Sequence, residues 1–322
     1  MRVYVTGGAG FIGGAVCRRL RSRGDDVVAV VRDPDRAGHL RDIGCEVRAG
    51  DLTSPEALTG GMRGCDGVIH VAGMYRVGLT RQERGAMYDA NVGAVHRVLQ
   101  AAIVAGVPRI VHVSTANVLG DTRGRIVDEN HRRDISRGFV SYYDETKYLA
   151  HVAARELIAS GAPILIAMPG TTYGPDDHSG IGRQLRDAFD GRIRFVAFPD
   201  LGISPAHVDD VAAGIVATLA QGRIGESYVL AGPNIRLRDA MEVAARVGGH
   251  RLTPIDLPTG LLRAFARLGP VVARSLGQPA NFGEVVRAAD GVTYWASSAK
   301  ASLKLGYSPR ELEGGLRDAF GR

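Results

Sequence analysis

The chain has 322 residues, and 45% of them are hydrophobic, which is enough to build one large or two modest globular cores. Its formal net charge of +6 comes from scattered arginines, without the basic runs and interleaved aromatics that are typical of a nucleic-acid groove. No apolar stretch is long enough to span a bilayer and no secretory signal precedes the first expected strand, so we expect a cytoplasmic protein with reduced cysteines.

Short apolar runs alternate with helical stretches along the first half of the chain. Strands are expected near residues 2–6, 26–31, 45–49, 67–72, 109–114 and 163–168. This alternation predicts an α/β fold with a doubly wound parallel sheet, the Rossmann arrangement, covered by helices on both faces. Beyond Pro169 the elements shorten, which predicts a smaller C-terminal substrate domain. We expect a Rossmann domain of residues 1–168 plus 203–231 and a substrate-binding domain of residues 169–202 plus 232–322.

A glycine-rich segment follows the first expected strand directly and opens the first expected helix. Its glycines, Gly7, Gly10 and Gly13, suit a tight turn, close approach of the backbone to a pyrophosphate and close packing of helix on strand. Phe11 and Ile12 begin the helix, whose free N–H groups and positive dipole end would face the phosphates. The segment predicts a dinucleotide-binding site.

Tyr143 and Lys147 are four residues apart in a second expected helix, so they share one of its faces. Lys147 is one of only three lysines in this arginine-rich chain. An ammonium beneath a phenol would lower the pKa of the phenol, as a general acid at a carbonyl oxygen requires. Tyr142 is the competing phenol, but no lysine lies four residues after it.

Several ordered motifs together resemble the extended short-chain dehydrogenase/reductases of the NAD-dependent epimerase/dehydratase superfamily. They are TGGAGFIG at residues 6–13, Asp51-Leu52, HVAG at residues 70–73, STA at residues 114–116, YDETK at residues 143–147, PGTTYGP at residues 169–175 and HVDDV at residues 207–211. The resemblance runs over nearly the whole chain. It is specific for the family and says little about the substrate.

The resemblance implies a role for each matching residue. Thr115, Tyr143 and Lys147 fall on the catalytic positions, with the Thr115 hydroxyl steadying the substrate oxygen and Lys147 also holding the nicotinamide ribose. Asp51 and Leu52 would bind the adenine, and Asn91 would order the active-site helix. The remaining expected cofactor contacts are Val71, Ala72, Gly73 and Pro169.

The end of the second expected strand bears on the choice of cofactor. An acidic residue there binds the ribose 2′-hydroxyl of NAD, whereas an arginine accommodates the 2′-phosphate of NADP. Arg32 takes that position and Arg36 lies one turn later, although Asp33 is an alternative ribose ligand. The string VRDP resembles dihydroflavonol-4-reductase-like members, which use NADPH. We therefore expect NADP(H) rather than NAD(H).

The substrate side of the sequence is less informative. Candidate substrate contacts are Met74, Tyr75, Thr171 and Tyr173, with Phe195 and Phe198 as further aromatics. Sugar-nucleotide dehydratases of the family resemble Thr-Asp-Glu where this chain has Thr115-Ala116-Asn117, and neither replacement can move the proton of water elimination. Dehydratase activity is therefore not expected. The pair Asp209-Asp210 beside His207 predicts helix capping and interdomain bonding rather than a metal site.

These expectations converge on an NADP(H)-dependent oxidoreductase that acts on a small-molecule carbonyl or alcohol, with Tyr143 as acid or base. Two alternatives stay open: a nucleotide-sugar epimerase with tightly bound cofactor, and a regulator that binds NAD(P) without reacting. Helical stretches near residues 85–105 and 143–160 carry apolar stripes. Because related enzymes often pair such helices across a two-fold axis, we expect a homodimer.

Overall fold

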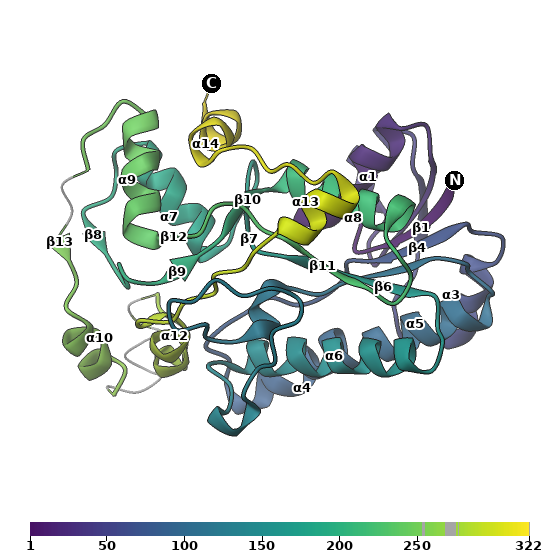
Figure 1. Cartoon of the computed structure of the whole chain (residues 1–322), viewed down its shortest axis with the longest axis horizontal. Helices are drawn as coiled ribbons and strands as arrows, with labels where there is room; N and C mark the ends of the chain where they lie inside the picture. Colours follow the sequence, from purple (N-terminus) through teal and green to yellow (C-terminus); the bar gives the residue numbers. More distant parts are fainter. Residues whose placement is uncertain (253–254, 268–274, 276, 322) are drawn as a thin grey trace.

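The computed structural model describes residues 1–252, 255–267, 275 and 277–321. A seven-stranded sheet, in the order β11-β6-β5-β4-β1-β2-β3, forms its centre (Figure 1). All of its neighbouring strands are parallel, which confirms the predicted fold class. The seven strands are β1 (Arg2–Thr6), β2 (Asp26–Val31), β3 (Glu46–Ala49), β4 (Gly67–His70), β5 (Ile110–Val113), β6 (Ile164–Pro169) and β11 (Ser227–Leu230).

Helices cover both faces of this sheet, and each face has its own apolar core. Val3 and Val5 point to one face and Tyr4 to the other, as the two-residue period of a strand requires. The first face is covered by α1 (Phe11–Ser22), α2 (Gly38–Asp42), α8 (Val208–Gln221) and α13 (Ala299–Leu305). The second face is covered by α3 (Pro55–Met62), α5 (Ala94–Val104) and α6 (Tyr142–Ala159).

The helix expected near residues 85–105 has an internal irregularity. It consists of α4 (Arg84–Tyr88), a π-helical turn over Asp89–Gly93, and then α5. A π-turn shifts the side chains that follow it around the helix axis, and such turns are frequent at functional sites. The irregular turn includes Asn91, one of the expected site residues.

A second lobe, on the left in Figure 1, packs its helices around a separate core that includes Leu185, Met241 and Leu316. Its helices are α7 (Gly180–Phe189), α9 (Leu237–Val247), α10 (Thr259–Phe265), α12 (Phe282–Ala289) and α14 (Leu312–Phe320). Three two-stranded sheets join it: β7 (Thr171–Tyr173) with β10 (Pro205–His207), β9 (Gly202–Ile203) with β12 (Ile235–Arg236), and β8 (Phe195–Val196) with β13 (Ile255–Asp256).

The predicted domain boundaries stay a prediction. One segment of the expected substrate domain lies against the other half of the molecule: Ala301, Leu305 and Tyr307 join the core on the α1 and α8 face of the central sheet. The parts of that expected domain at residues 253–254, 268–274, 276 and 322 lie outside the described residues.

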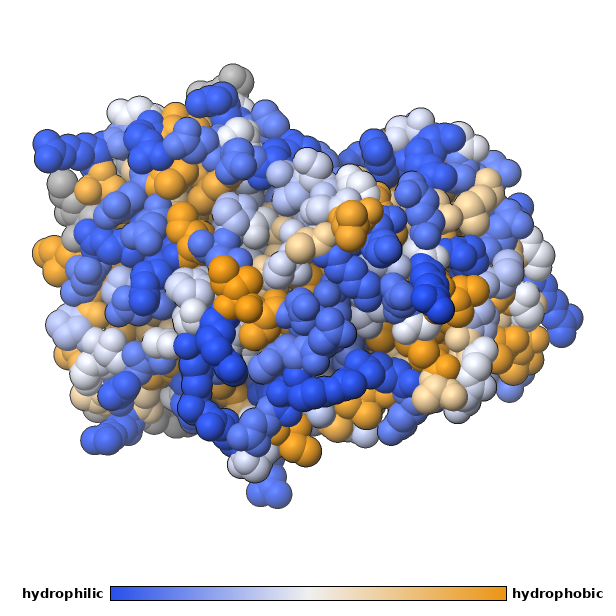
Figure 2. Space-filling view, viewed as in Figure 1, coloured by the Kyte–Doolittle hydropathy of each residue, from blue (hydrophilic) through white to orange (hydrophobic). Residues whose placement is uncertain are grey.

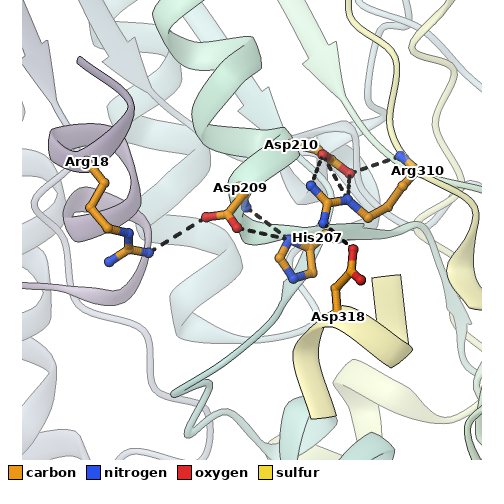
Figure 3. A network of polar contacts seen from close by, with 6 residues as sticks. All are labelled: Arg18, His207, Asp209, Asp210, Arg310 and Asp318. Carbon is orange, nitrogen blue, oxygen red and sulfur yellow. Dashed lines mark hydrogen bonds and ion pairs between the residues drawn. The ribbon is translucent and has the colours of Figure 1, made fainter. Parts of the chain in front are cut away.

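A polar network ties the C-terminal segment to the start of α8 (Figure 3). His207 caps this helix, because its Nδ1 accepts from the Asp209 N–H at 3.2 Å, and Asp209 also pairs with Arg18 of α1. Asp210 accepts from Arg310 through both carboxylate oxygens, and Arg310 also pairs with Asp318 of α14 at 2.8 Å. The expected helix capping is therefore present, and Asp210 makes a long-range ion pair with Arg310.

Three histidines are buried beside the edge of the sheet where β4 and β5 end. His70 and His112 are neighbours on these strands, with ring centroids 5.9 Å apart, and neither ring nitrogen of His112 has a partner among the described residues. Burial lowers the pKa of His70 to about 3 and that of His151 to about 4, and it holds the pKa of His112 well below 6.5. All three are therefore neutral in the folded protein near neutral pH.

These histidines predict a loss of stability in mild acid. Because their pKa values are lower in the folded chain than in the unfolded one, the stabilisation is complete above pH 6.5 and is lost as the pH falls. When the pH falls from 6.5 to 4.5, the unfolding free energy of His70→Asn should decrease by about 2 kcal/mol less than that of wild type. Urea unfolding at both pH values measures this difference. His96 is exposed, so His96→Asn should lose as much unfolding free energy as wild type over this pH range. If His70→Asn also loses as much as wild type, the buried His70 does not cause the loss of stability.

On the face shown in Figure 2, apolar residues are scattered among hydrophilic ones rather than gathered into one patch. In the described part of the chain, no helix combines the length and the apolar character that crossing a bilayer would require. Cys17, Cys45 and Cys65 are buried free thiols.

Candidate active site

The glycine-rich turn between β1 and α1 leaves no room for side chains. Gly7 has φ +74°, and a Cβ there would lie 2.7 Å from the Ala72 nitrogen. A Cβ on Gly13 would lie 2.0 Å from the Gly7 oxygen. Gly10 begins α1 without a side-chain cap, so the first N–H groups of the helix are left for a ligand. These features fit a dinucleotide whose pyrophosphate rests on the helix N-terminus.

The residues that follow β4 lie directly beside this turn. The Thr6 hydroxyl contacts His70 Nδ1 at 2.7 Å and accepts a long hydrogen bond of 3.4 Å from the Ala72 N–H. Val71 is partly buried against the core, and a Cβ on Gly73 would lie 3.2 Å from Asn91 Oδ1. The structure thus brings the expected segment Val71–Gly73 to the glycine turn.

The expected adenine contacts lie further along the same edge. Asp51 is exposed, and its carboxylate accepts from the Thr53 N–H at 2.9 Å; the hydrogen bonds from Thr53 lower the pKa of Asp51. Leu52 is partly buried against the second core. Phe11 and Ile12, at the start of α1, pack against the first core and therefore help to hold this helix on the sheet.

The two arginines after β2 are exposed, and within the described chain neither Arg32 nor Arg36 has a hydrogen bond or ion pair. Asp33, the competing residue, already accepts a hydrogen bond from the Asp35 N–H at 3.2 Å. Both guanidinium groups are therefore available to an anion, while the carboxylate helps to form the local turn.

Tyr143 and Tyr142 lie in different surroundings at the start of α6. The Tyr143 ring packs edge-to-face on Tyr75, with centroids 4.7 Å apart. The Tyr142 ring instead stacks beneath the Arg84 guanidinium at 4.8 Å. Tyr143, and not Tyr142, therefore lies beside Tyr75, in the loop that follows Val71–Gly73.

Lys147 is nearly buried one turn after Tyr143. Its Nζ donates to the Val113 oxygen at 3.2 Å, so it reaches the end of β5 just before Thr115. Burial lowers the pKa of Lys147 to about 8. This contact fixes α6, which carries Tyr143, against the strand that ends just before Thr115.

The expectation of a lowered Tyr143 pKa is wrong for this structure. Burial raises the pKa of the Tyr143 phenol, and neighbouring Tyr75 and Asp144 add to the rise. Burial is the largest cause of the rise, and the Lys147 ammonium donates to the Val113 carbonyl. The phenol is therefore protonated at neutral pH but is a weaker acid than a free tyrosine in this structure.

The side chains of Ser114 and Thr115, just after β5, have different local contacts. The Thr115 hydroxyl accepts from the Asn117 N–H at 3.2 Å and makes a long contact of 3.4 Å to the Pro169 oxygen. Ser114, not Thr115, is drawn into the core, where its hydroxyl contacts His151 Nδ1 at 3.1 Å. Thr115 is therefore the cap of the 3₁₀ segment that begins at Ala116.

Asn91 links three parts of the site. Its amide donates to and accepts from the backbone of Met74, at 3.0 and 2.7 Å. It also donates to the Thr146 hydroxyl of α6 at 3.0 Å. Asn91 thus joins α6 to the loop after β4, while its role in ordering an active-site helix stays a prediction.

Two carboxylates beside Tyr143 were not found from the sequence. Asp144 forms a two-pronged ion pair with Arg133, at 2.5 and 2.6 Å, with both side chains almost fully buried. Glu284 of α12 accepts from the Tyr142 N–H. Their partners are distant in sequence, and neither has a local signal beyond a polar residue on a helix.

The candidate substrate residues separate into two groups. Met74 and Tyr75 lie in the loop beside Tyr143, and Tyr75 is 59% exposed. Tyr173 is 1% exposed and packs on the His207 ring, which indicates a structural role. Thr171 lies in β7 beside it. The further aromatics lie in the second lobe, Phe195 in the small sheet of β8 and Phe198 in its core.

Comparison with known proteins identifies the family. Residues 3–231 match the NAD dependent epimerase/dehydratase family. A 4-hydroxy-2-methyl-3-oxo-4-farnesyl-3,4-dihydroquinoline-1-oxide ketoreductase of Stigmatella aurantiaca is 32% identical over 86% of this chain and 82% of its own. A protein of Synechocystis sp., provisionally named dihydroflavonol 4-reductase, is 29% identical over 98% and 92% of the two chains.

A solved structure agrees with these sequence relatives. The crystal structure of gox2253 superposes with a TM-score of 0.84 at 31% identity, covering 98% of this chain and 96% of that one. The family match spans the glycine turn, the strand ends and the helix of Tyr143 and Lys147 described above. The chain therefore belongs to the NAD dependent epimerase/dehydratase family, within the extended short-chain dehydrogenase/reductases.

Proposed function

We propose that this protein is an NADPH-dependent reductase of a small-molecule carbonyl, running as an alcohol dehydrogenase in reverse. The observation that carries the proposal is the Lys147–Val113 hydrogen bond, because it fixes the helix of Tyr143 against the end of β5, where Thr115 lies. The names of the two sequence relatives above, both reductases, support the same reaction class. When bound, the nicotinamide would supply a hydride to the carbonyl carbon.

The residues of this chain would do the rest. Tyr143, held protonated by its surroundings, would donate its proton to the carbonyl oxygen as negative charge develops there. The Thr115 hydroxyl would turn from the Asn117 N–H to donate to the same oxygen. Lys147 would hold the ribose, and the glycine turn the pyrophosphate. Arg32 and Arg36 would bind the 2′-phosphate of NADPH.

A substrate screen tests the proposal. Purified protein is mixed with NADPH and a panel of ketones and aldehydes, and loss of absorbance of the reduced cofactor is followed beside product formation. One NADPH oxidised for each alcohol formed supports the reductase. Conversion of sugar nucleotides without net NADPH oxidation would favour an epimerase instead, and cofactor binding without turnover of either panel would favour a regulator.

We also propose a homodimer built from α4, α5 and α6. Two large apolar residues on these helices, Tyr88 and Leu149, are 47% and 37% exposed. A two-fold contact would bury them in a four-helix interface. Light scattering at micromolar concentration should give twice the 34.2 kDa mass of the chain, and Leu149→Arg should shift the protein towards the monomer. A monomeric wild type would rule out this assembly.

A further inference from the structure

Glu284 is a buried carboxylate that joins two walls of the candidate active site. It lies in α12 of the second lobe and is 1% exposed. Its Oε1 accepts from the N–H of Tyr142, the first residue of α6, and its Oε2 accepts from the N–H of Gly78 at 2.9 Å. One side chain thus holds the helix of Tyr143 and the loop of Tyr75 at a fixed separation.

The loop side of this contact is tightly fitted. Gly78 has φ +86°, and a Cβ there would lie 2.5 Å from Pro279. The Gly78 oxygen accepts from the Asn281 N–H at 3.1 Å, so donor and acceptor of Gly78 both bind the segment that begins α12. Tyr75 lies three residues before Gly78, so this anchor holds the segment that carries the Tyr75 ring near α12.

On the helix side of the contact, a backbone N–H at the start of α6 binds the Glu284 carboxylate. The N–H of Tyr142 is one of the free donors at the N-terminus of α6, where the helix dipole favours a negative charge. No lysine or arginine in the described chain pairs with Glu284. The two carboxylate oxygens accept from one N–H each, which a neutral amide in the same position could not do because it carries a single acceptor oxygen.

We propose that Glu284 is a positioning residue that keeps the Tyr75 ring against the catalytic phenol of Tyr143. The edge-to-face contact of the two rings, 4.7 Å between centroids, is then set from the second lobe. This inference rests on the reductase activity proposed above. It gives the second lobe a direct connection to the proton donor, separate from any contact with the substrate.

Glu284→Gln tests the proposal with almost no change of shape. The amide keeps one acceptor oxygen but turns an N–H₂ group towards the second backbone N–H, so one wall is released. We expect kcat to fall about ten- to a hundredfold, because small displacements of reacting groups have effects of this size. The Kd for NADPH should be unchanged. Hydrogen–deuterium exchange should become faster at residues 75–80 and 142–146.

Asp290→Asn is the matched control, because it removes a carboxylate from the end of the same helix. Asp290 pairs with Arg263 and contacts neither wall of the site. It should leave kcat and the exchange of both segments as in wild type. A Glu284→Gln protein with wild-type kcat and unchanged exchange would overturn the proposal. If the wild type reduces no carbonyl, the proposed function fails, while the exchange measurement still decides the role of Glu284.

Two Tyr75 variants give an independent test should Glu284→Gln fold poorly. Tyr75→Phe keeps the ring contact and should keep kcat within about twofold, whereas Tyr75→Ala should lower kcat about tenfold or more. In a folded double variant, Glu284→Gln should add little to Tyr75→Ala, since both changes act on one contact. Equal kcat values for Tyr75→Ala and wild type would contradict the positioning role.

Discussion

Replacing Tyr143 with phenylalanine should reduce kcat at least about a hundredfold, the usual scale of general acid catalysis, while NADPH still binds. The change removes one hydroxyl and keeps the ring that packs on Tyr75. Any loss of kcat therefore measures the contribution of the hydroxyl proton and not a change in ring packing. Steady-state oxidation of NADPH with the best carbonyl from the substrate screen, together with fluorescence titration of the cofactor, separates turnover from binding.

Tyr142→Phe is the control for this experiment, because it makes the same chemical change at the adjacent residue. Tyr142 stacks on Arg84, and its contact to Glu284 uses the backbone N–H, which the substitution keeps. Its kcat should stay within about threefold of wild type. If the two variants lose activity equally, Tyr143 is not the proton donor.

Substituting Arg32 with alanine should lower kcat/KM for NADPH about ten- to a hundredfold. A guanidinium beside the 2′-phosphate makes charge-assisted hydrogen bonds worth about 1.5–3 kcal/mol. Since Arg32 has no partner within the described chain, the variant should lose this interaction without breaking a structural one. The value for NADH should barely change, because NADH lacks the phosphate.

Arg36 allows a graded version of this test. It is also exposed and unpaired within the described residues, so it can compensate in part, and the double variant should lose more than Arg32→Ala alone. Arg41→Ala serves as a control, because Arg41 already donates to the Pro34 oxygen. A wild type that prefers NADH, or a cofactor ratio that both substitutions leave unchanged, would defeat the NADP assignment and favour Asp33 as the ribose ligand.

The features that could be predicted from the sequence are those with short-range signals. The strand–glycine–helix unit at Gly7–Gly13 depends on residues that are close in the chain, and the apolar and helical patterns predicted six of the seven strands of the sheet, all but β11. The Tyr143–Lys147 pair likewise follows from helix geometry alone. The family comparison agrees with this part of the interpretation.

The parts that could not be predicted depend on long-range contacts or on competing local ones. Glu284 meets Gly78 across 206 residues, and Arg133 meets Asp144 through a loop whose path no pattern indicates. Burial raises the Tyr143 pKa, with further contributions from Tyr75 and Asp144, and spacing along one helix contains no information on burial. The π-turn at Asn91 has no periodic signature long enough to detect.

The connections between the two lobes have a mechanical consequence. The chain passes from the central sheet to the second lobe and back repeatedly, at β6–β7, β10–α8, β11–β12 and on both sides of α13 (Figure 1). A hinge crossed by several chain segments is stiff, because all of them must bend together when the lobes move. The Arg310–Asp210 ion pair adds another restraint. We therefore expect the two lobes to move as one body when substrate binds.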